Sequence, residues 1–317
     1  MRTVDLEPSQ IYDFADAIGD RKLLRGGIGP DSDMILLTVA PEYLDIARGR
    51  TNRHGASFPH SLARQPYPAT VIHSVDTDIV VSFDIAEVTA AHPHIQPLAG
   101  SRILIVAARC FYVDGAGEEN ATIYRADGQV ERRMVFGDGI NAVQVSRGQQ
   151  IWVSYSDEGI FGNFGWREPI GRDGLLCFDT DGKIIWRFHP PDGSDQICDC
   201  YALNVANRAV WAYYYTDFPV VRIAGDKQID MWTNELGGAS AITTDGRRVL
   251  LWGGYNDRTR CVLQTISGDK LDSMTTINLI LAEGDISQAQ YVIGRDSVLH
   301  VLVGTVWYQF DVHHIPW

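Results

Sequence analysis

Residues 151–188 read IWVSYSDEGIFGNFGWREPIGRDGLLCFDTDGKIIWRF. The runs IWVSY, LLCF and IIWRF predict three β-strands, because short apolar and aromatic runs bounded by Gly, Asp and Asn are typical of strands. The second and third strands are joined by the tight turn DTDGK. The first strand instead ends at Asp157 and Glu158 and is followed by a long glycine-rich loop. This contrast between a short and a long connection guides the interpretation of the whole chain.

The same pattern recurs along the sequence. Five times, four strand-like runs follow one another, with short Gly, Asp or Asn turns after the first and third runs. A sixth repeat has only three runs before the chain ends at Trp317. The repeats begin near residues 22, 94, 140, 200, 239 and 287. This recurrence predicts an all-β fold, a six-bladed β-propeller with four-stranded antiparallel blades, and a single domain over residues 1–317.

The last repeat needs a fourth strand from elsewhere in the chain. Residues 2–8, RTVDLEP, are the expected donor, since an N-terminal strand in the last blade would remove an open sheet edge. Residues 9–22, SQIYDFADAIGDRK, carry the clearest helical pattern, with Ser9 as a possible N-cap. The first blade is expected to contain a long loop insertion at about residues 40–68.

Composition limits the class of protein. Apolar residues make up 45% and charged residues 21%, which is ordinary for a globular chain. No apolar run is long enough to span a bilayer, and the first residues do not resemble a secretory signal, so we expect a cytoplasmic protein without membrane attachment. A net charge of −13 argues against nucleic-acid binding. A monomer is expected, because a propeller closes on itself.

The five cysteines argue against a disulfide framework. Their number is odd and no CxxC pair occurs. Cys198 and Cys200 are two residues apart, so on a strand they would point to the same side. They could bind a soft metal, or they could be two small buried side chains.

The element DGKIIWRF at 181–188, with weaker copies at 127–136 and 226–232, resembles blades of a broad bacterial propeller superfamily that includes NHL-type and lactonase-type members. The resemblance covers the whole chain as an architecture. Lactonase-type members hold a divalent metal with Glu, Asn and Asp side chains, but those ligands have no residue-by-residue counterpart here. The cofactor is therefore unknown, with a divalent metal as one option. The segments DEGIFG and YYYTDFPVVRI resemble bacterial propellers more closely, and that resemblance implies no activity.

Strand direction alternates within an antiparallel blade, so all second-to-third loops and blade links should share one face. These connections are the long ones, at 40–68, 110–120, 157–174 and 189–197. Function concentrates in diverse loops on a rigid scaffold, so we expect a small-molecule or peptide site at this mouth of the channel.

The acids and histidines of these loops are the first candidates. Asp157, Asp217 and Asp257 end equivalent strands, and together they could raise one another's pKa, bind a cation or attract a basic partner. Alternatively, each acid caps its own turn. The arginine-rich insertion could close over a ligand or supply an acid and a base, or it could be a solvated surface loop. The candidate catalytic residues are Asp157, Glu158, Asp199, His54, His60 and His189.

The remaining candidates would contact substrate. Arg167 and Arg258 could anchor an anionic group, and Phe161, Phe164 and Trp166 could wall a pocket for a flat ligand. The candidate substrate-binding residues are Trp166, Arg167, Tyr215, Asp217, Tyr255, Asp257 and Arg258. Blade packing is expected of Trp152, Trp186, Trp211, Trp232 and Trp252.

Two functions remain open. The first is a hydrolase or lyase with acid–base or metal-assisted chemistry, although GxSxG, HExxH and Walker motifs do not occur. The second is a non-catalytic protein of interaction, inhibitor or immunity type, whose acidic face binds a basic partner. The enzyme predicts an enclosed pocket with two titratable groups, whereas the interaction protein predicts a broad acidic and aromatic surface.

Overall fold

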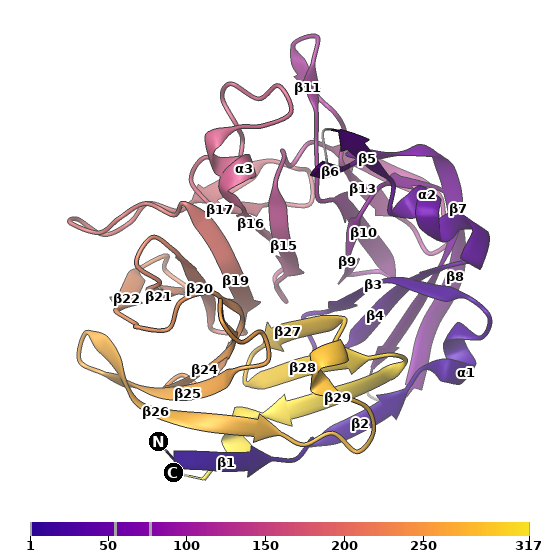
Figure 1. The fold of residues 1–317 in the computed structure, drawn as a ribbon. Helices are drawn as coiled ribbons and strands as arrows, with labels where there is room; N and C mark the ends of the chain where they lie inside the picture. The colour runs from indigo at the N-terminus through magenta and orange to yellow at the C-terminus, as the bar shows by residue number, and fades with distance from the viewer. Residues whose placement is uncertain (1, 54–55, 76–77, 317) are drawn as a thin grey trace. The chain divides into compact units, whose positions relative to one another are not determined.

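The computed structural model describes residues 2–53, 56–75 and 78–316. Five four-stranded sheets and one five-stranded sheet form six blades that follow one another along the chain, which confirms the predicted all-β, six-bladed β-propeller (Figure 1). The chain divides into two compact units with three blades each. We call residues 17–188 the middle unit, and residues 1–16 with 189–317 the terminal unit. The prediction of a single domain stays a prediction.

The three blades of the middle unit are antiparallel throughout. The first blade contains β3 (Lys22–Ile28), β4 (Met34–Val39), β7 (Leu62–Val75) and β8 (Asp78–Ala90). The second contains β9 (Pro93–Leu98), β10 (Arg102–Ala107), β13 (Ala121–Tyr124) and β14 (Val130–Met134). The third contains β15 (Ile140–Val145), β16 (Ile151–Tyr155), β17 (Leu175–Phe178) and β18 (Ile184–Arg187).

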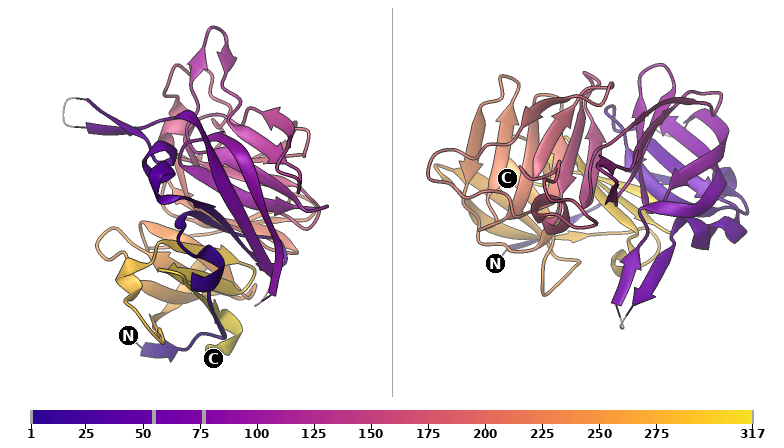
Figure 2. Two further views of the ribbon diagram at one scale, coloured as in Figure 1. Left: turned by 90° about the vertical axis from the view of Figure 1, so that its right-hand side faces the viewer. Right: turned by 90° about the horizontal axis from the view of Figure 1, so that it is seen from above.

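Each middle-unit blade carries extra structure between its second and third strands. The first blade adds η1 (Pro41–Tyr43), α2 (Leu44–Ala47) and the hairpin of β5 (Arg50–Arg53) and β6 (Ala56–Pro59), which projects from the blade (Figure 2). The second adds the hairpin of β11 (Tyr112–Val113) and β12 (Ala116–Gly117), and the third adds α3 (Asp157–Phe161). The predicted insertion at 40–68 is therefore a helix and a hairpin rather than an irregular loop.

The terminal unit contains the last three blades. The fourth has β19 (Asp199–Val205), β20 (Ala209–Tyr215), β21 (Val220–Ala224) and β22 (Ile229–Trp232). The fifth has β23 (Ala239–Thr244), β24 (Arg248–Gly253), β25 (Cys261–Ser267) and β26 (Lys270–Leu279). The sixth has β27 (Tyr291–Arg295), β28 (Val298–Val303) and β29 (Val306–Asp311), with η2 (Ile286–Gln288) before it and η3 (Val312–His314) after it.

An N-terminal strand completes the last blade, as predicted, but the segment differs from the expected one. The fourth strand of that blade is β2 (Gln10–Asp13), which pairs antiparallel with β29. The expected donor forms β1 (Arg2–Leu6), which pairs parallel with β26 of the fifth blade. The predicted helix over 9–22 is correspondingly reduced to α1 (Ala15–Ile18), because residues 10–13 gain a ladder of strand hydrogen bonds instead.

The cores lie between neighbouring sheets of each unit. In the middle unit, Leu37, Val71 and Ile105 pack together between the first and second blades. In the terminal unit, Trp211 and Leu251 pack between the fourth and fifth. The prediction for the five tryptophans is confirmed: four are buried, and Trp186 lies against Trp152 with ring centroids 5.2 Å apart. Across the described part of the chain, helices are too short to cross a membrane.

Candidate functional site

Three connections of the middle unit meet around one pocket of about 550 Å³. The first-blade insertion, the β10–β13 connection and the β16–β17 connection all contribute to its walls. Its lining comprises Thr51, Phe58, Pro59, His60, Ser61, Leu62, Phe111, Glu118 and Phe164. Within the middle unit, this confirms the expectation that second-to-third connections gather at one end of the blades.

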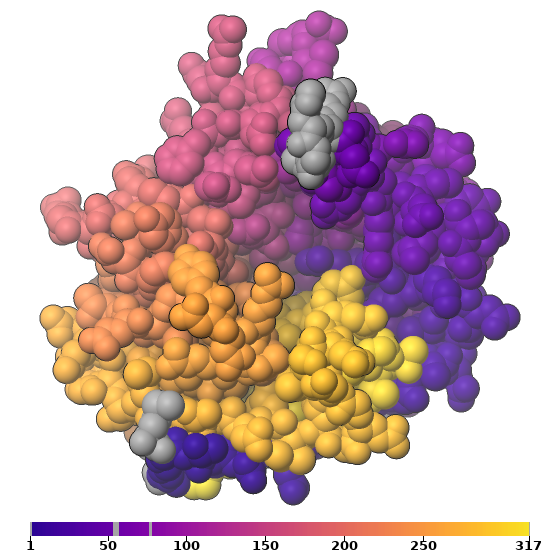
Figure 3. Space-filling model, viewed as in Figure 1, coloured from indigo at the N-terminus to yellow at the C-terminus, as the bar shows by residue number. Residues whose placement is uncertain are grey.

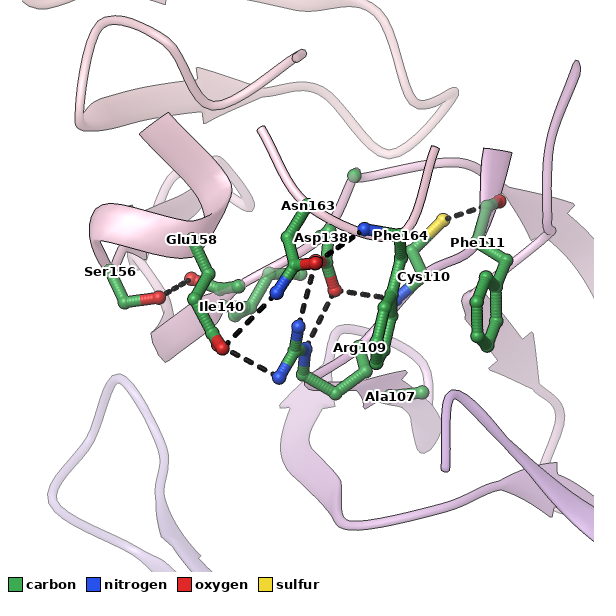
Figure 4. A network of polar contacts seen from close by, with 12 residues as sticks. Ala107, Arg109, Cys110, Phe111, Asp138, Ile140, Ser156, Glu158, Asn163 and Phe164 are labelled. Carbon is green, nitrogen blue, oxygen red and sulfur yellow. Dashed lines mark hydrogen bonds and ion pairs between the residues drawn. The ribbon is translucent and has the colours of Figure 1, made fainter. Parts of the chain in front are cut away.

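One wall of the pocket is a stack of three planar groups. The rings of Phe111 and Phe164 lie nearly parallel, with centroids 4.2 Å apart. The guanidinium carbon of Arg109 lies 4.1 Å from the centroid of the Phe164 ring, which Figure 4 shows between Arg109 and Phe111. Tyr112 N–H also donates to Phe164 O at 2.8 Å. The β11–β12 hairpin and the connection after α3 are thereby fixed side by side, and Figure 3 shows them projecting together.

Behind this wall, Arg109 is the centre of a charge network that is buried at Asp138 and exposed at Glu158. Its Nε and Nη2 donate to the two carboxylate oxygens of Asp138 at 2.8 and 3.0 Å, and its Nη1 lies 2.8 Å from Glu158 Oε2. Cys110 N–H donates to Asp138 Oδ1 at 2.9 Å. Burial lowers the pKa of Arg109, but the two carboxylates outweigh it and raise the pKa above its usual value. A fully buried carboxylate is thus matched by a buried guanidinium.

The network explains why the β16 strand ends in two acids. Both begin α3, where Asp157 Oδ1 accepts a hydrogen bond from Glu158 N–H at 2.7 Å. Glu158 binds Arg109 and also accepts from Asn163 Nδ2 at 3.3 Å. These contacts fasten the start of the long connection, so that Phe164 reaches the pocket wall. Asp157 and Glu158 themselves are not among the lining residues.

The polar side of the pocket contains two titratable side chains, His60 and Glu118. His60 Nε2 and Thr51 Oγ1 share a hydrogen bond of 2.8 Å, and His60 N–H donates to Gly49 O at 2.9 Å. Glu118 Oε2 accepts from Phe111 N–H at 2.9 Å. His60 was predicted as a candidate and lies in the pocket, whereas the other insertion candidate, His54, lies outside the described residues.

The aromatic residues after α3 have different positions. Phe164 lines the pocket, and Phe161 is 68% exposed on α3. Trp166 was expected to be available to a ligand, but it is buried: its Nε1 donates to Cys110 O at 2.8 Å and its ring lies 4.8 Å from that of Tyr112. An indole N–H that finds a backbone acceptor is stable inside a protein, which accounts for the difference. Arg167 is exposed and does not line the pocket.

The other candidate residues lie in the terminal unit. Tyr215 and Tyr255 are exposed and belong to a cluster of aromatic rings with Phe218. Asp199 is half-buried in β19, whereas four candidates are exposed. These four are His189, Asp217, Asp257 and Arg258. The gathering of all the acids around one mouth stays a prediction, because Asp157 and Glu158 belong to the middle unit.

Two of the candidate acids cap their own turns, as the alternative interpretation predicted. Asp257 Oδ1 accepts from Thr259 N–H at 2.9 Å and from Thr259 Oγ1 at 2.8 Å, and these hydrogen bonds lower the pKa of Asp257. Asp157 accepts from the next residue, as described above. In the part of the chain that the structure describes, no group of three His, Cys, Asp or Glu side chains is placed to hold a metal ion. All five cysteines are free thiols.

Several residues of this site were not predicted from the sequence. One sequence feature could have indicated Arg109 and Asp138. Each is a single charged residue beside an apolar run, and a charge that is buried there needs a partner of opposite charge. Phe58, Phe111 and Glu118 lie in connections that the sequence correctly indicates to be long. Their meeting depends on the shapes of three separate connections, which no local pattern encodes.

A model of the YxzG family matches residues 175–245. A comparison with curated proteins finds no match. Among solved structures, a virginiamycin B lyase from Staphylococcus aureus is 10% identical over 96% of this chain and 98% of that chain, with a TM-score of 0.49. Hsv2 from Kluyveromyces lactis is 12% identical over 89% and 71%, with a TM-score of 0.49. A gluconolactonase from Xanthomonas campestris is 12% identical over 96% and 94%, with a TM-score of 0.47. Similarity at this level assigns no ligand or reaction to this chain.

Proposed function

We propose that the protein binds a small molecule, or one side chain of a peptide, in the pocket of the middle unit. The observation that supports this most strongly is the convergence of three separate connections on one pocket with both aromatic and polar walls. Its volume of about 550 Å³ falls in the usual range for ligand sites, roughly 300–1,000 Å³. The expected ligand has a flat apolar part and at least one hydrogen-bonding group.

The aromatic wall is organised before a ligand arrives. Phe164 is held between Arg109 and Phe111, so binding needs little ordering of that ring. Phe58 and Phe111 remain partly exposed, and covering such rings with a flat ligand gains both apolar burial and ring stacking. The hydrogen-bonded pair of His60 and Thr51 supplies the polar contact that would fix the ligand's orientation.

A titration with indole, followed by NMR on the full chain, tests this proposal. Phe58→Ala should weaken indole binding about tenfold, equivalent to ~1.4 kcal/mol, because it removes one aromatic wall. Phe161→Ala is the matched control, since Phe161 is more exposed than Phe58 but does not line the pocket. Equal binding of indole to both variants would show that the pocket is not the binding site.

Acid–base catalysis in the same pocket is the second candidate function. It is favoured by the two titratable side chains, His60 and Glu118, that line one pocket. In a hydrolase, His60 would take a proton from the water that attacks the substrate carbonyl. Hydrolysis of 4-nitrophenyl acetate, measured from pH 5 to pH 9, should then be lost in His60→Ala and Glu118→Gln. Glu119→Gln, at an exposed neighbouring acid outside the pocket, should keep it. The same rate in all variants would exclude this use of the pocket.

A further inference from the structure

The terminal unit holds a second group of aromatic side chains, two exposed and two half-buried, which we call the aromatic cluster. It consists of Tyr201 in β19, Tyr215 at the end of β20, Phe218 in the β20–β21 connection and Tyr255 after β24. Phe218 lies at the centre, with ring centroids 5.5 Å from Tyr215, 5.8 Å from Tyr255 and 6.2 Å from Tyr201. The hydroxyls of Tyr201 and Tyr255 are hydrogen-bonded at 2.8 Å.

The backbone around the cluster is arranged to present these rings. Asp217 and Phe218 both have positive φ, at 58° and 56°. A bulky residue seldom adopts this conformation, which costs about 1–2 kcal/mol, so the surroundings must hold Phe218 in place. Its ring stacks on the fully buried Tyr213 at 5.8 Å, which anchors the cluster to the core. The backbone at Gly237 lies directly beside the rings, since a Cβ there would be 3.3 Å from both Phe218 and Tyr255.

Two rings of the cluster stay largely in solvent. Tyr215 is 45% exposed and Tyr255 is 63% exposed. Adjacent exposed aromatic rings, fixed by a strained turn and by backbone contact, are unusual for a surface without a partner. Tyr201 and Phe218 pack against the core between the fourth and fifth blades, while Tyr215 and Tyr255 extend this packing onto the surface and give it the character of a recognition surface.

Charged side chains of both signs lie near the rings. Asp217 is exposed and directly precedes Phe218. Burial raises the pKa of Tyr201, and the Tyr255 hydrogen bond and the nearby charge of Asp199 raise it further. On the loop after Tyr255, Asp257 accepts hydrogen bonds from Thr259 and lies near Arg260. Arg258, on the same loop, is exposed. The charge of Asp199 reaches Tyr201 and Asp217 directly precedes Phe218, so both acids favour a cation at the rings, and the net charge of −13 adds to their effect.

We propose that the aromatic cluster is a docking site for a lysine or arginine side chain on a basic segment of a partner protein. Cations bind over the faces of aromatic rings, and nearby carboxylates strengthen that attraction. The exposed rings suit a side chain that is presented by another protein surface. This site goes beyond the proposed function, because it shares no residue with the middle-unit pocket.

Calorimetric titration of the full chain with the peptide acetyl-GRGRGRG-amide tests the proposal. Tyr255→Ala and Asp217→Asn should each weaken binding about fivefold, whereas Tyr255→Phe, which keeps the ring, should bind nearly as well as the wild type. Asp226→Asn is the control for charge, since Asp226 is an exposed acid of the same unit in the β21–β22 turn. Phe161→Ala in the middle unit is the control for loss of an exposed ring, and both controls should bind like the wild type.

Several results would overturn the proposal. Equal weakening by Asp226→Asn and Asp217→Asn would show that only the overall negative charge attracts the peptide. Equal weakening by Tyr255→Phe and Tyr255→Ala would exclude the ring as the cation's contact. Binding of acetyl-GEGEGEG-amide would exclude recognition of a cation. Tetramethylammonium binding as tightly as the arginine peptide would assign the cluster to a free small cation and not to a partner protein. Circular dichroism of each variant confirms that it is folded.

Discussion

The middle and terminal units hold their aromatic side chains by different means. In the middle unit, long connections are fixed by a buried ion pair, Arg109–Asp138, and Phe164 lies on that guanidinium. In the terminal unit, the β20–β21 connection is only a few residues long, and Phe218 is directed by its own positive φ. A long connection has many conformations and needs a strong specific anchor, whereas a short one can be fixed by backbone geometry alone.

The difference has a consequence for what each unit can bind. Long connections from three blades surround a pocket, with walls from residues far apart in the sequence. The short connection leaves Tyr215 and Tyr255 on an open surface. A pocket suits a small ligand or a single side chain, and an open cluster suits a group carried by a partner surface. The following predictions test whether the two anchoring schemes differ as the structure indicates.

The largest effect is expected for the ion pair of the middle unit. Arg109→Met leaves Asp138 buried without its cation, which should lower the free energy of unfolding by about 3–5 kcal/mol in urea denaturation. Arg102→Met is the matched control, because Arg102 pairs with Glu131 at the surface and such pairs contribute about 0–1 kcal/mol. Similar losses for both variants would mean that the network does not anchor these connections.

Much of the fold could be predicted from the sequence. Each blade has its own apolar strand runs and turn residues, and these signals are local and repeated six times. The N-terminal segment was assigned less well, since RTVDL and QIYD are both plausible edge strands. The choice between them depends on which sheet edge each one reaches, and that is decided by pairing with β26 and β29.

The candidate site could be predicted only in part. The alternation of strand direction predicts the end of the blades at which the site lies and the connections that form it. His60 and Phe164 are among the residues that the sequence correctly places there. The roles of Glu158 and Trp166 could not be predicted. For Glu158, the sequence pattern of an acid after a strand is the same whether the side chain faces a ligand or a buried arginine. Only the position of Arg109, 49 residues earlier in the chain, decides between these roles for Glu158.

A smaller effect is expected at the glycines of the terminal unit, where backbone geometry is the anchor. Gly238 has a φ of 81°, and a Cβ there would lie 2.8 Å from the Tyr255 ring. Gly238→Ala should therefore destabilise the protein by about 2–3 kcal/mol through backbone strain and overlap. Gly246→Ala has the same kind of strain, with a φ of 89° but open space around the Cβ, and should lose only about 1–2 kcal/mol. The difference between the two losses in the free energy of unfolding, measured by urea denaturation, reports the contact between Gly238 and Tyr255. Equal losses would show that this contact does not matter for stability.

A third comparison uses one buried aromatic hydrogen bond from each unit. Trp166→Phe removes the Nε1 donor to Cys110 O, and Tyr213→Phe removes the hydroxyl that binds Leu236 O. Each should lower the free energy of unfolding by about 1–2 kcal/mol, since a buried carbonyl loses its donor. Trp166→Phe should also weaken indole binding by disturbing Tyr112 and the pocket wall, while Tyr213→Phe should not. Loss of indole binding in Tyr213→Phe alone would contradict the assignment of the pocket to the middle unit.

The smallest effect is a difference in acid sensitivity. Each unit buries an aspartate whose pKa lies below its usual value: Asp33 in the middle unit and Asp245 in the terminal unit. Burial raises both pKa values, but for Asp33 the hydrogen bond and charge of His73, together with the backbone N–H groups of Asp31 and Asp33, outweigh it. For Asp245 the backbone N–H groups and the side chain of Arg248 outweigh it. Stability from each carboxylate is present above the pKa of an unfolded Asp, about 3.9, and is lost as the pH falls through the lower folded value.

Replacing His73 by a neutral side chain tests how far His73 lowers the pKa of Asp33. In His73→Gln, Asp33 keeps its burial but loses the partner that lowers its pKa. The loss of stability should be largest near pH 7. It should shrink as the pH falls from the pKa of Asp33 in the variant, which burial raises, to its lowered pKa in the wild type, below which Asp33 is protonated in both proteins. Urea denaturation at pH 7 and pH 3 measures this change. Arg147→Gln breaks the exposed pair with Asp31 and should give a small loss at both pH values. A constant loss in His73→Gln would show that His73 acts by packing and not through the charge of Asp33.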